Sequence, residues 1–438
     1  MKFHRGGGAQ ERNLPKGFRS DNPSYLCRMQ YEYYELKNGI RGVFRRTPSK
    51  VLHLGLITAA GSRDEAGEEH GLAHFLEHMI FKGTRRRSSF RILNYIDGIG
   101  GELNAFTTRE ETCLHASVPV DYAEKAFDLI ADVFLHASFP EQELKKEKEV
   151  VADEIASYLD MPDEMIFDEF EERIFPGHPI GRCVQGKAET VMSFNREHLQ
   201  SFVRRNYSGK NTVVSCCGDM DPARWRRFMD KYYGEAITGT PSAVRKKPGH
   251  IPAFFELVSK PIHQSHAVIG SRAFSVHDHR RTPMVLLNNL LGGPANNSLL
   301  NIAVRERRGL CYHIESSYHP YSDCGVFMVY LGSDRRNLQK ALQLALKELG
   351  RLSAAPLGSS VLQGIKKQLL GQLILGHESH QAEMLSMGKS TLVRGSVYSL
   401  EQAIRDIESV TTADLLETAR LVTDPGILST LIYESSGL

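Results

Sequence analysis

The order of hydrophobic and polar residues predicts strands early in the chain and helices after them. Residues 31–46 predict a β-hairpin, because Asn38-Gly39 can adopt the two positive φ angles of a tight turn between two strand-like runs. Residues 51–60 predict a third strand, and the spacing then becomes helical. Two more strands are expected within 101–120, and helices at 69–81, 88–97, 121–136, 141–159 and 163–174. This order is typical of an α+β domain.

The second half of the chain repeats this pattern weakly. Residues 117–134 and 331–349 each contain a strand end, a polar cap and a helix, and an offset of 215 residues aligns a Lys-Ala pair in both. A repeat of this size predicts two similar domains, although any two strand–helix units share such features. The expected division is a flexible polar tail at 1–28, a first domain at 29–234, a linker at 235–250 and a second domain at 251–438.

Charge and composition disfavour several classes of protein. The chain has 438 residues, with 54 Lys and Arg against 52 Asp and Glu, and its basic residues are scattered, which argues against a nucleic-acid binder. No apolar run approaches the roughly 18 residues of a membrane helix, and no secretory signal is recognisable, so a cytoplasmic protein without membrane insertion is expected. Seven cysteines without a CxxC pair predict free thiols in a reducing compartment.

The most specific chemical signal is the segment HFLEH at residues 74–78. On a helix, His74 and His78 are four residues apart and project from one face, so both imidazoles can bind one metal ion. The carboxylate of Glu77 reaches the same region. The alternative is a pair of solvated or capping histidines on an amphipathic helix.

A third ligand is expected elsewhere, because a catalytic zinc ion usually has three protein ligands and one open position. The predicted helix at 141–159 offers two candidates, Glu147 and Glu154, which lie about two turns apart on one face. An ordinary solvated helix would carry the same acidic residues, so the spacing leaves both interpretations open.

At this point the chain resembles the inverzincins of the pitrilysin, insulinase and mitochondrial processing peptidase family, which are zinc metallopeptidases. HFLEH matches their inverted H-x-x-E-H motif. Glu154 lies 76 residues beyond His78, and Glu147 lies seven before Glu154, as in the family. The resemblance covers the chain from about residue 30 onward and points to the short, two-domain bacterial type. Further matching segments are AGSRDE (60–65), GGELNAFTT (100–108) and VRERRGLCY (304–312).

The resemblance implies a zinc site in the first domain, with one Zn²⁺ per chain. It assigns His74, His78 and Glu154 as ligands and Glu77 as the general base that activates water together with zinc. Glu147 becomes an outer-shell carboxylate that orients a ligand. The implied fold is α+β, with two similar domains, each a mostly antiparallel sheet with helices packed on one face.

The resemblance also implies residues that contact the substrate. Asn104 and Ala105 lie in a strand where an extended peptide can add as a further strand, provided that it is an edge strand; an internal strand fits the pattern equally well. Arg305 and Tyr312 match an arginine and tyrosine pair that contacts substrate in the family. Without the resemblance they would be a solvated charge and a core aromatic. Residues 288–293, the counterpart of HFLEH, carry no metal ligand.

These implications predict a zinc metalloendopeptidase that hydrolyses short or unfolded peptides. Because chains of this length are half the size of the large family members, which enclose a peptide between two halves, a homodimer is expected. The alternatives are a non-catalytic core or assembly subunit of the same fold and a metal-binding scaffold without turnover. Neither nucleic acid nor a membrane is an expected partner.

Overall fold

The computed structural model describes residues 30–235, 245–249 and 251–437. The expected polar tail at 1–28, most of the linker at 235–250 and Cys27 lie outside these residues. The six cysteines of the described part are all free. Within the same part, no helix is long and apolar enough to cross a bilayer.

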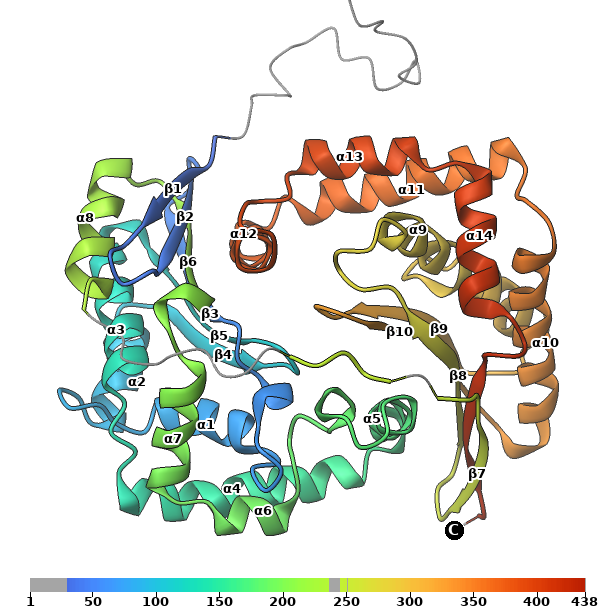
Figure 1. The fold of residues 1–438 in the computed structure, drawn as a ribbon, viewed down its shortest axis with the longest axis horizontal. Helices are drawn as coiled ribbons and strands as arrows, with labels where there is room; N and C mark the ends of the chain where they lie inside the picture. The colour runs from blue at the N-terminus through green and yellow to red at the C-terminus, as the bar shows by residue number, and fades with distance from the viewer. Residues whose placement is uncertain (1–29, 236–244, 250, 438) are drawn as a thin grey trace, which may run out of the picture.

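The first half contains six strands and the helices between them, in the described part of the chain (Figure 1). Its strands are β1 (Glu32–Glu35), β2 (Arg41–Arg46), β3 (Val51–Thr58), β4 (Glu102–Thr107), β5 (Thr112–Pro119) and β6 (Thr212–Gly218). Its α-helices are α1 (Leu72–Ile80), α2 (Ser89–Asp97), α3 (Ala123–His136), α4 (Glu141–Leu159), α5 (Pro162–Ile174), α6 (Ala188–Ser193), α7 (Arg196–Asn206) and α8 (Pro222–Tyr233).

The second half repeats this plan. Its strands are β7 (Phe255–Lys260), β8 (Ser265–Ala273), β9 (His313–Pro320), β10 (Gly325–Ser333) and β11 (Ser429–Ser435). Its helices are α9 (Arg281–Gly292), the π-helical η6 (Asn301–Glu306), α10 (Arg335–Ala354), α11 (Ser359–Gly376), α12 (His380–Arg394), α13 (Leu400–Ser409) and α14 (Thr412–Thr423).

The strand orders confirm the duplication. The first sheet runs β1-β2-β6-β3-β5-β4 and the second runs β7-β11-β8-β10-β9, so five strands recur in the same order. β2 pairs in parallel with β6, as β7 does with β11, and the other strand pairs of the described residues are antiparallel. β3 begins at residue 51 and β8 at residue 265, which are 214 residues apart. The fold is therefore α+β with two similar domains, as predicted.

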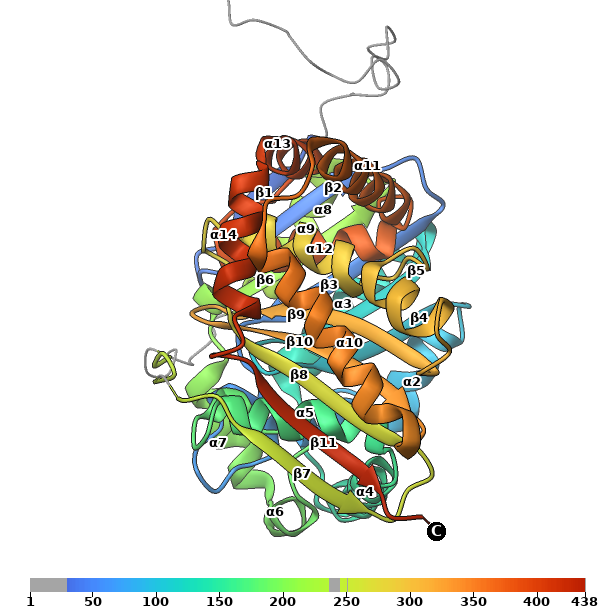
Figure 2. The ribbon, with the colours of Figure 1, turned by 90° about the vertical axis from the view of Figure 1, so that its right-hand side faces the viewer.

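Each sheet packs its own helices on one face. A core that includes Leu54 of β3, Phe75 of α1 and Phe127 of α3 lies on that face of the first sheet. In the second sheet, Ile269 of β8 and Leu349 of α10 belong to the equivalent core, and Figure 2 shows α10 in front of these strands. Helices of its own half thus pack on one face of each sheet, as the family resemblance implies.

The opposite face of each sheet is covered by a helix from the other half, which the sequence did not predict. α12 of the second half packs on β6 and β3, and α5 of the first half packs on β8 and β11 (Figure 1). Phe170 of α5 is fully buried there, beside Val268 and Leu431. We call this arrangement the reciprocal helix exchange.

Glycines let α12 approach the first sheet closely. A Cβ atom at Gly55 of β3 would lie 2.5 Å from Sδ of Met384, and one at Gly388 of α12 would lie 2.5 Å from Cδ1 of Ile57. Both distances are too short for a real side chain. The hydroxyl of Ser215 also donates to the carbonyl of Met384 at 2.6 Å, so the contact is tight and specific.

A buried ionic cluster joins the two halves. Arg63, whose side chain is 2% exposed, pairs with Glu110 and with Asp323 of the β9–β10 loop, each at 2.6 Å. Arg245 donates to Asp64 at 2.7 Å. Burial of an unpaired arginine is costly. The position of Arg63 in the AGSRDE segment is therefore stabilised by Glu110 of the first half and by Asp323 of the second.

The first hairpin forms where expected but with a different turn. β1 ends at Glu35 and β2 begins at Arg41. The amide of Leu36 donates to Ile40 and that of Gly39 to Leu36, both at 2.9 Å. Of the residues in this turn, only Gly39 has a positive φ, of 89°, so the predicted pair of positive φ angles is wrong. A three-residue loop ending in a left-handed glycine makes the turn instead.

Candidate metal centre

Helix α1 presents His74, Glu77 and His78 on one face. Its other face is buried in the first core, through Leu72, Ala73, Phe75, Leu76, Met79 and Ile80. The three polar side chains are half-buried and lie on the side where α1 packs against α4 and β4. The two imidazole rings have centroids 4.8 Å apart. The three side chains therefore share one face of α1, as the helical spacing predicts, and they are half-buried and not fully solvated.

The start of α1 is held in place by Glu65. Its carboxylate accepts hydrogen bonds from the amides of Gly71, at 3.1 Å, and Ala73, at 2.9 Å. Burial raises the pKa of Glu65 to about 8, although these two amides oppose the shift. Gly71 has a φ of 96°, and a Cβ atom there would lie 2.7 Å from the carbonyl oxygen of Gln185. Glu65 and Gly71 together therefore stabilise the first turn of α1.

Helix α4 brings Glu154 to the two histidines. Oε1 of Glu154 lies 3.7 Å from Nε2 of His74, and Oε2 lies 3.4 Å from Nε2 of His78. The ligand atoms of the three residues all lie within 4.8 Å of one another. Two imidazole nitrogens and a carboxylate are a donor set that suits catalytic zinc. The residues present therefore fit the predicted Zn²⁺ site.

Glu147, two turns before Glu154 on α4, orients His78. Nδ1 of His78 donates to Oε1 of Glu147 at 3.0 Å, and Nζ of Lys82 lies 2.7 Å from Oε2. A neutral imidazole that donates from Nδ1 keeps its lone pair on Nε2, the atom that faces Glu154. Burial would raise the pKa of Glu147, but His78 and Lys82 together lower it below its ordinary value. The carboxylate stays ionised and holds the ring.

Burial shifts the pKa values of His74 and Glu77, the other two titratable groups of α1 at this centre, in opposite directions. Burial lowers the pKa of His74 to about 4, which leaves its imidazole neutral and able to bind a metal ion. Burial raises the pKa of Glu77. Oε2 of Glu77 and Nδ1 of His74 are buried without a hydrogen-bond partner among the described residues. The carboxylate of Glu77 interacts electrostatically with His78 and Glu154, and the nearby hydroxyl of Thr107 opposes the rise in its pKa.

Replacement of Glu147 by Gln should weaken zinc binding without removing a ligand. We expect an approximately 10- to 100-fold loss of zinc affinity, because the amide cannot hold the His78 ring as firmly as the carboxylate does. Competition against a fluorescent zinc chelator measures this directly. Glu149→Gln, an exposed position on the same helix, is the matched control, and equal affinity in both variants would contradict the orienting role.

The strand that carries Asn104 and Ala105 is an edge strand. β4 pairs only with β5 within the described residues, with Asn104 opposite His115 and Ala105 opposite Leu114. Asn104 is exposed, and its Oδ1 accepts a hydrogen bond from the amide of Ala105 at 2.8 Å. Because α1 packs against β4, the free edge runs beside the helix of the metal centre.

Arg305 and Tyr312 lie in the second half, both exposed. Arg305 belongs to η6 and donates to Asn301 at 3.4 Å. The hydroxyl of Tyr312, a side chain that is 57% exposed, donates to Asp334 at 3.0 Å. Both hydrogen bonds are made to residues of the second half. Neither bond involves His74, His78 or Glu154. Tyr312 is not the core aromatic that its sequence context alone suggests.

The sequence pattern alone did not predict two residues that support the site, Lys82 and Glu65. Lys82 lies four residues after His78, so helical spacing could have placed it beside Glu147. Glu65 lies just before the helix, and only its family motif marked it.

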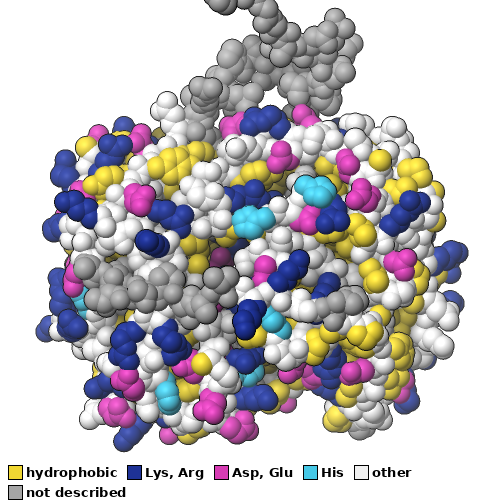
Figure 3. Space-filling model, viewed as in Figure 1, with side chains coloured by type: hydrophobic (Ala, Val, Ile, Leu, Met, Phe, Trp, Pro, Cys, Tyr) yellow, Lys and Arg dark blue, Asp and Glu magenta, His cyan; other side chains and the backbone are white. Residues whose placement is uncertain are grey.

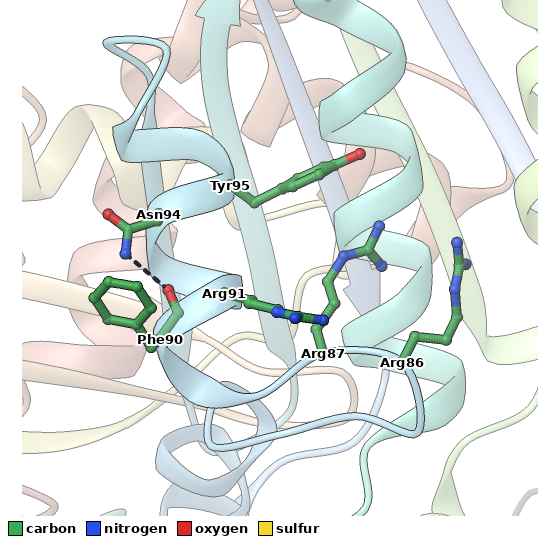
Figure 4. Close-up of a pocket in the computed structure, with 6 residues that line it drawn as sticks. All are labelled: Arg86, Arg87, Phe90, Arg91, Asn94 and Tyr95. Carbon is green, nitrogen blue, oxygen red and sulfur yellow. Dashed lines mark hydrogen bonds between the residues drawn. The ribbon is translucent and has the colours of Figure 1, made fainter.

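A hollow of about 380 Å³ on α2 (Figure 4) contains none of the metal-centre residues, and its Arg86 and Arg87 already pair with Asp128. Basic and acidic side chains are interspersed over the face shown in Figure 3.

Comparisons with known proteins agree with the geometry. Residues 43–187 match the family described as insulinase (peptidase family M16), and residues 193–369 match the family described as the peptidase M16 inactive domain. The uncharacterized zinc protease YmxG of Bacillus subtilis is 32% identical over 379 residues, which are 86% of this chain and 92% of YmxG. The uncharacterized zinc protease Rv2782c of Mycobacterium tuberculosis is 33% identical over 390 residues, covering 88% and 89% of the two chains.

Solved structures show the same fold. A crystal structure of a peptidase M16 inactive domain from Pseudomonas fluorescens superimposes with a TM-score of 0.86 at 20% identity, covering 93% of this chain and 98% of that one. A protease from Helicobacter pylori gives a TM-score of 0.84 at 20% identity, covering 93% and 99%. The chain belongs to the insulinase family of zinc peptidases, peptidase family M16.

Proposed function

We propose that this protein is a zinc-dependent endopeptidase that hydrolyses short or unfolded peptides. The observation that carries the proposal is the convergence of three groups, His74, His78 and Glu154, with the carboxylate of Glu77, which interacts electrostatically with His78 and Glu154. A scaffold that only stored the metal would need the three ligands but not Glu77.

The chain's own residues divide the chemistry between them. His74, His78 and Glu154 would hold Zn²⁺, which would lower the pKa of a bound water and polarise the peptide carbonyl. Glu77 takes the proton of the attacking water at its carboxylate and then gives it to the amine of the leaving peptide. Glu147 holds the ring of His78 throughout, so that its Nε2 stays directed at the site.

The edge of β4 supports an extended substrate. Backbone groups of a peptide can pair with those of Asn104 and Ala105, which gives affinity with little demand on sequence. A folded protein cannot offer a free extended segment, so this binding mode favours short or unfolded peptides over native proteins.

Hydrolysis of a quenched peptide library, together with metal analysis, tests the proposal. We expect cleavage within the peptides, loss of cleavage after chelation, and recovery when Zn²⁺ alone is restored. A protein that binds zinc but cleaves no member of the library would instead be the non-catalytic subunit or scaffold of this fold.

We further propose a homodimer in which Arg305 and Tyr312 of one chain complete the zinc site of the other. Both side chains are exposed and available to a second copy. A tyrosine hydroxyl and a guanidinium can donate to the oxygen of the attacked carbonyl, where negative charge develops; such a donor often contributes about 3 kcal/mol.

Mixed dimers test this sharing of residues. A Glu77→Gln chain and a Tyr312→Phe chain, each nearly inactive alone, should regain activity when they are assembled together. One of the two sites then has every group, so recovery of up to about half the wild-type rate per mixed dimer is expected. Differently tagged chains allow the mixed dimer to be purified and its kcat measured.

The control is a mixed dimer of two Glu77→Gln chains with different tags, which should stay inactive. If purified dimers of Glu77→Gln and Tyr312→Phe chains show no recovery, the site is built within one chain or Tyr312 has no part in it.

A further inference from the structure

A second cluster of ligand-type side chains lies where the two halves meet. Cys217 is on β6 of the first sheet, and His380 and Glu383 are in the first turn of α12, which belongs to the second half. One ligand atom from each of the three residues, the Sγ of Cys217, an imidazole nitrogen of His380 and a carboxylate oxygen of Glu383, lies within 4.8 Å of the other two. Cys217 and Glu383 are buried, and His380 is half-buried.

We propose that Cys217, His380 and Glu383 form a second metal site, which binds Zn²⁺ and links α12 to the first sheet. The expected stoichiometry then rises from the one zinc ion per chain predicted from the sequence to two. This proposal is independent of peptidase activity, because it uses none of the residues of the first centre.

The carboxylate of Glu383 is already directed at the other two ligands. One of its oxygens, Oε1, is paired with the guanidinium of Arg45. The other, Oε2, lies 3.9 Å from Sγ of Cys217 and 3.7 Å from Nδ1 of His380. Arg45 therefore orients this carboxylate as Glu147 orients His78 in the first centre. Its positive charge also offsets part of the negative charge of a bound thiolate and carboxylate.

The remaining ligand atoms have few competing partners. Nδ1 of His380 is buried and makes no hydrogen bond with the described residues, so a buried nitrogen points into the cluster without a partner. Sγ of Cys217 has the hydroxyl of Thr47 at 3.7 Å. His53 is a neighbour of the cluster, because it lies opposite Cys217 in the β3–β6 register and on the same face of the sheet. Its Nδ1 is 2.8 Å from the hydroxyl of Ser117, so this nitrogen already has a partner.

The spacing and the donor types favour zinc. Bond lengths of about 2.0–2.3 Å in a tetrahedral site place ligand atoms roughly 3.3–3.8 Å apart, so small side-chain movements suffice. The separations resemble those of the first centre, where Glu154 lies 3.7 and 3.4 Å from the two imidazole nitrogens. A thiolate with an imidazole selects Zn²⁺ over Mg²⁺ or Ca²⁺, which prefer oxygen ligands.

Binding requires that Cys217 lose its proton. Burial, together with the nearby Glu383, raises the pKa of the Cys217 thiol to about 11. The S–H bond breaks as the sulfur–zinc bond forms, the electron pair stays on sulfur, and the proton leaves to solvent. No change of oxidation state is involved.

Zinc stoichiometry by elemental analysis of the full chain after dialysis tests the second site. We expect two zinc ions per wild-type chain and one in His380→Ala, which removes a partly exposed side chain and therefore should fold. A His74→Ala/His78→Ala variant should also keep one, and the combined triple variant none. Equal zinc content in the wild type and His380→Ala would overturn the proposal, whereas a loss of one ion in His380→Ala supports it whether or not the first centre is filled.

Cobalt substitution identifies the ligands without any activity assay. The first centre contains no sulfur, so a near-ultraviolet thiolate-to-Co²⁺ charge-transfer band in the His74→Ala/His78→Ala variant must come from a cysteine. Cys217→Ser in that background should abolish the band. Cys183→Ser, which changes a half-buried thiol near Asp168, is the matched control and should keep it. A band that survives Cys217→Ser would exclude Cys217 as a ligand.

Discussion

Glu77→Gln is expected to lower kcat/KM for peptide hydrolysis by about 10²- to 10⁴-fold while zinc stays bound. The amide of Gln has nearly the same shape as the carboxylate but cannot accept the proton of the attacking water. His74, His78 and Glu154 are unchanged, so the affinity for zinc should remain close to that of the wild type. Cleavage of a quenched peptide and elemental analysis of the same sample measure both quantities.

A matched control separates the loss of the base from a general loss of charge. Glu68→Gln removes an exposed carboxylate shortly before α1 and should leave kcat/KM unchanged. Full activity in Glu77→Gln with zinc bound would mean that another group accepts the proton.

Glu154→Gln is expected to abolish activity in a different way, through loss of the metal. An outer-shell partner typically changes zinc affinity by about 10- to 100-fold, and a direct ligand should matter more than that. Because Glu154 faces both histidines, its amide would replace the one anionic group among the three ligands. Zinc affinity should fall by more than about 100-fold, with hydrolysis at background at ordinary zinc concentrations.

Asp153→Asn, an exposed neighbour on α4, is the control for that experiment and should retain zinc and activity. If Glu154→Gln bound zinc as tightly as Asp153→Asn, the third ligand would have to be another residue.

The fold was predictable because its elements follow simple periodic patterns. The helix expected at 141–159 occupies those residues as α4, and the helix expected at 163–174 is α5, one residue longer. Both histidines of the first centre lie in a single helical segment, so one spacing rule placed them on one face. The expected third ligand needed the family resemblance, because Glu147 and Glu154 lie on one face of the helix and an ordinary solvated helix would carry the same acidic residues.

The second cluster could not be predicted in this way. Cys217 and His380 are more than 160 residues apart in the chain, and no local pattern marks either one. They meet only because α12 crosses to the other sheet, which depends on the close approach at Gly55 and Gly388. Contacts that depend on how two domains dock are not contained in the period of either segment.

The reciprocal helix exchange also sets an order of events during synthesis. Domains usually fold as units, the N-terminal one first, while the chain is being made. Here the first sheet is complete once β6 has emerged, yet residues such as Val213 stay uncovered on one face until α12 follows. The buried cluster around Phe170 of α5 is complete only after β11, the last of the described strands, has been made. Each sheet therefore keeps one apolar face open until an element of the other half has been made, and this open face is the part of the nascent chain most exposed to aggregation.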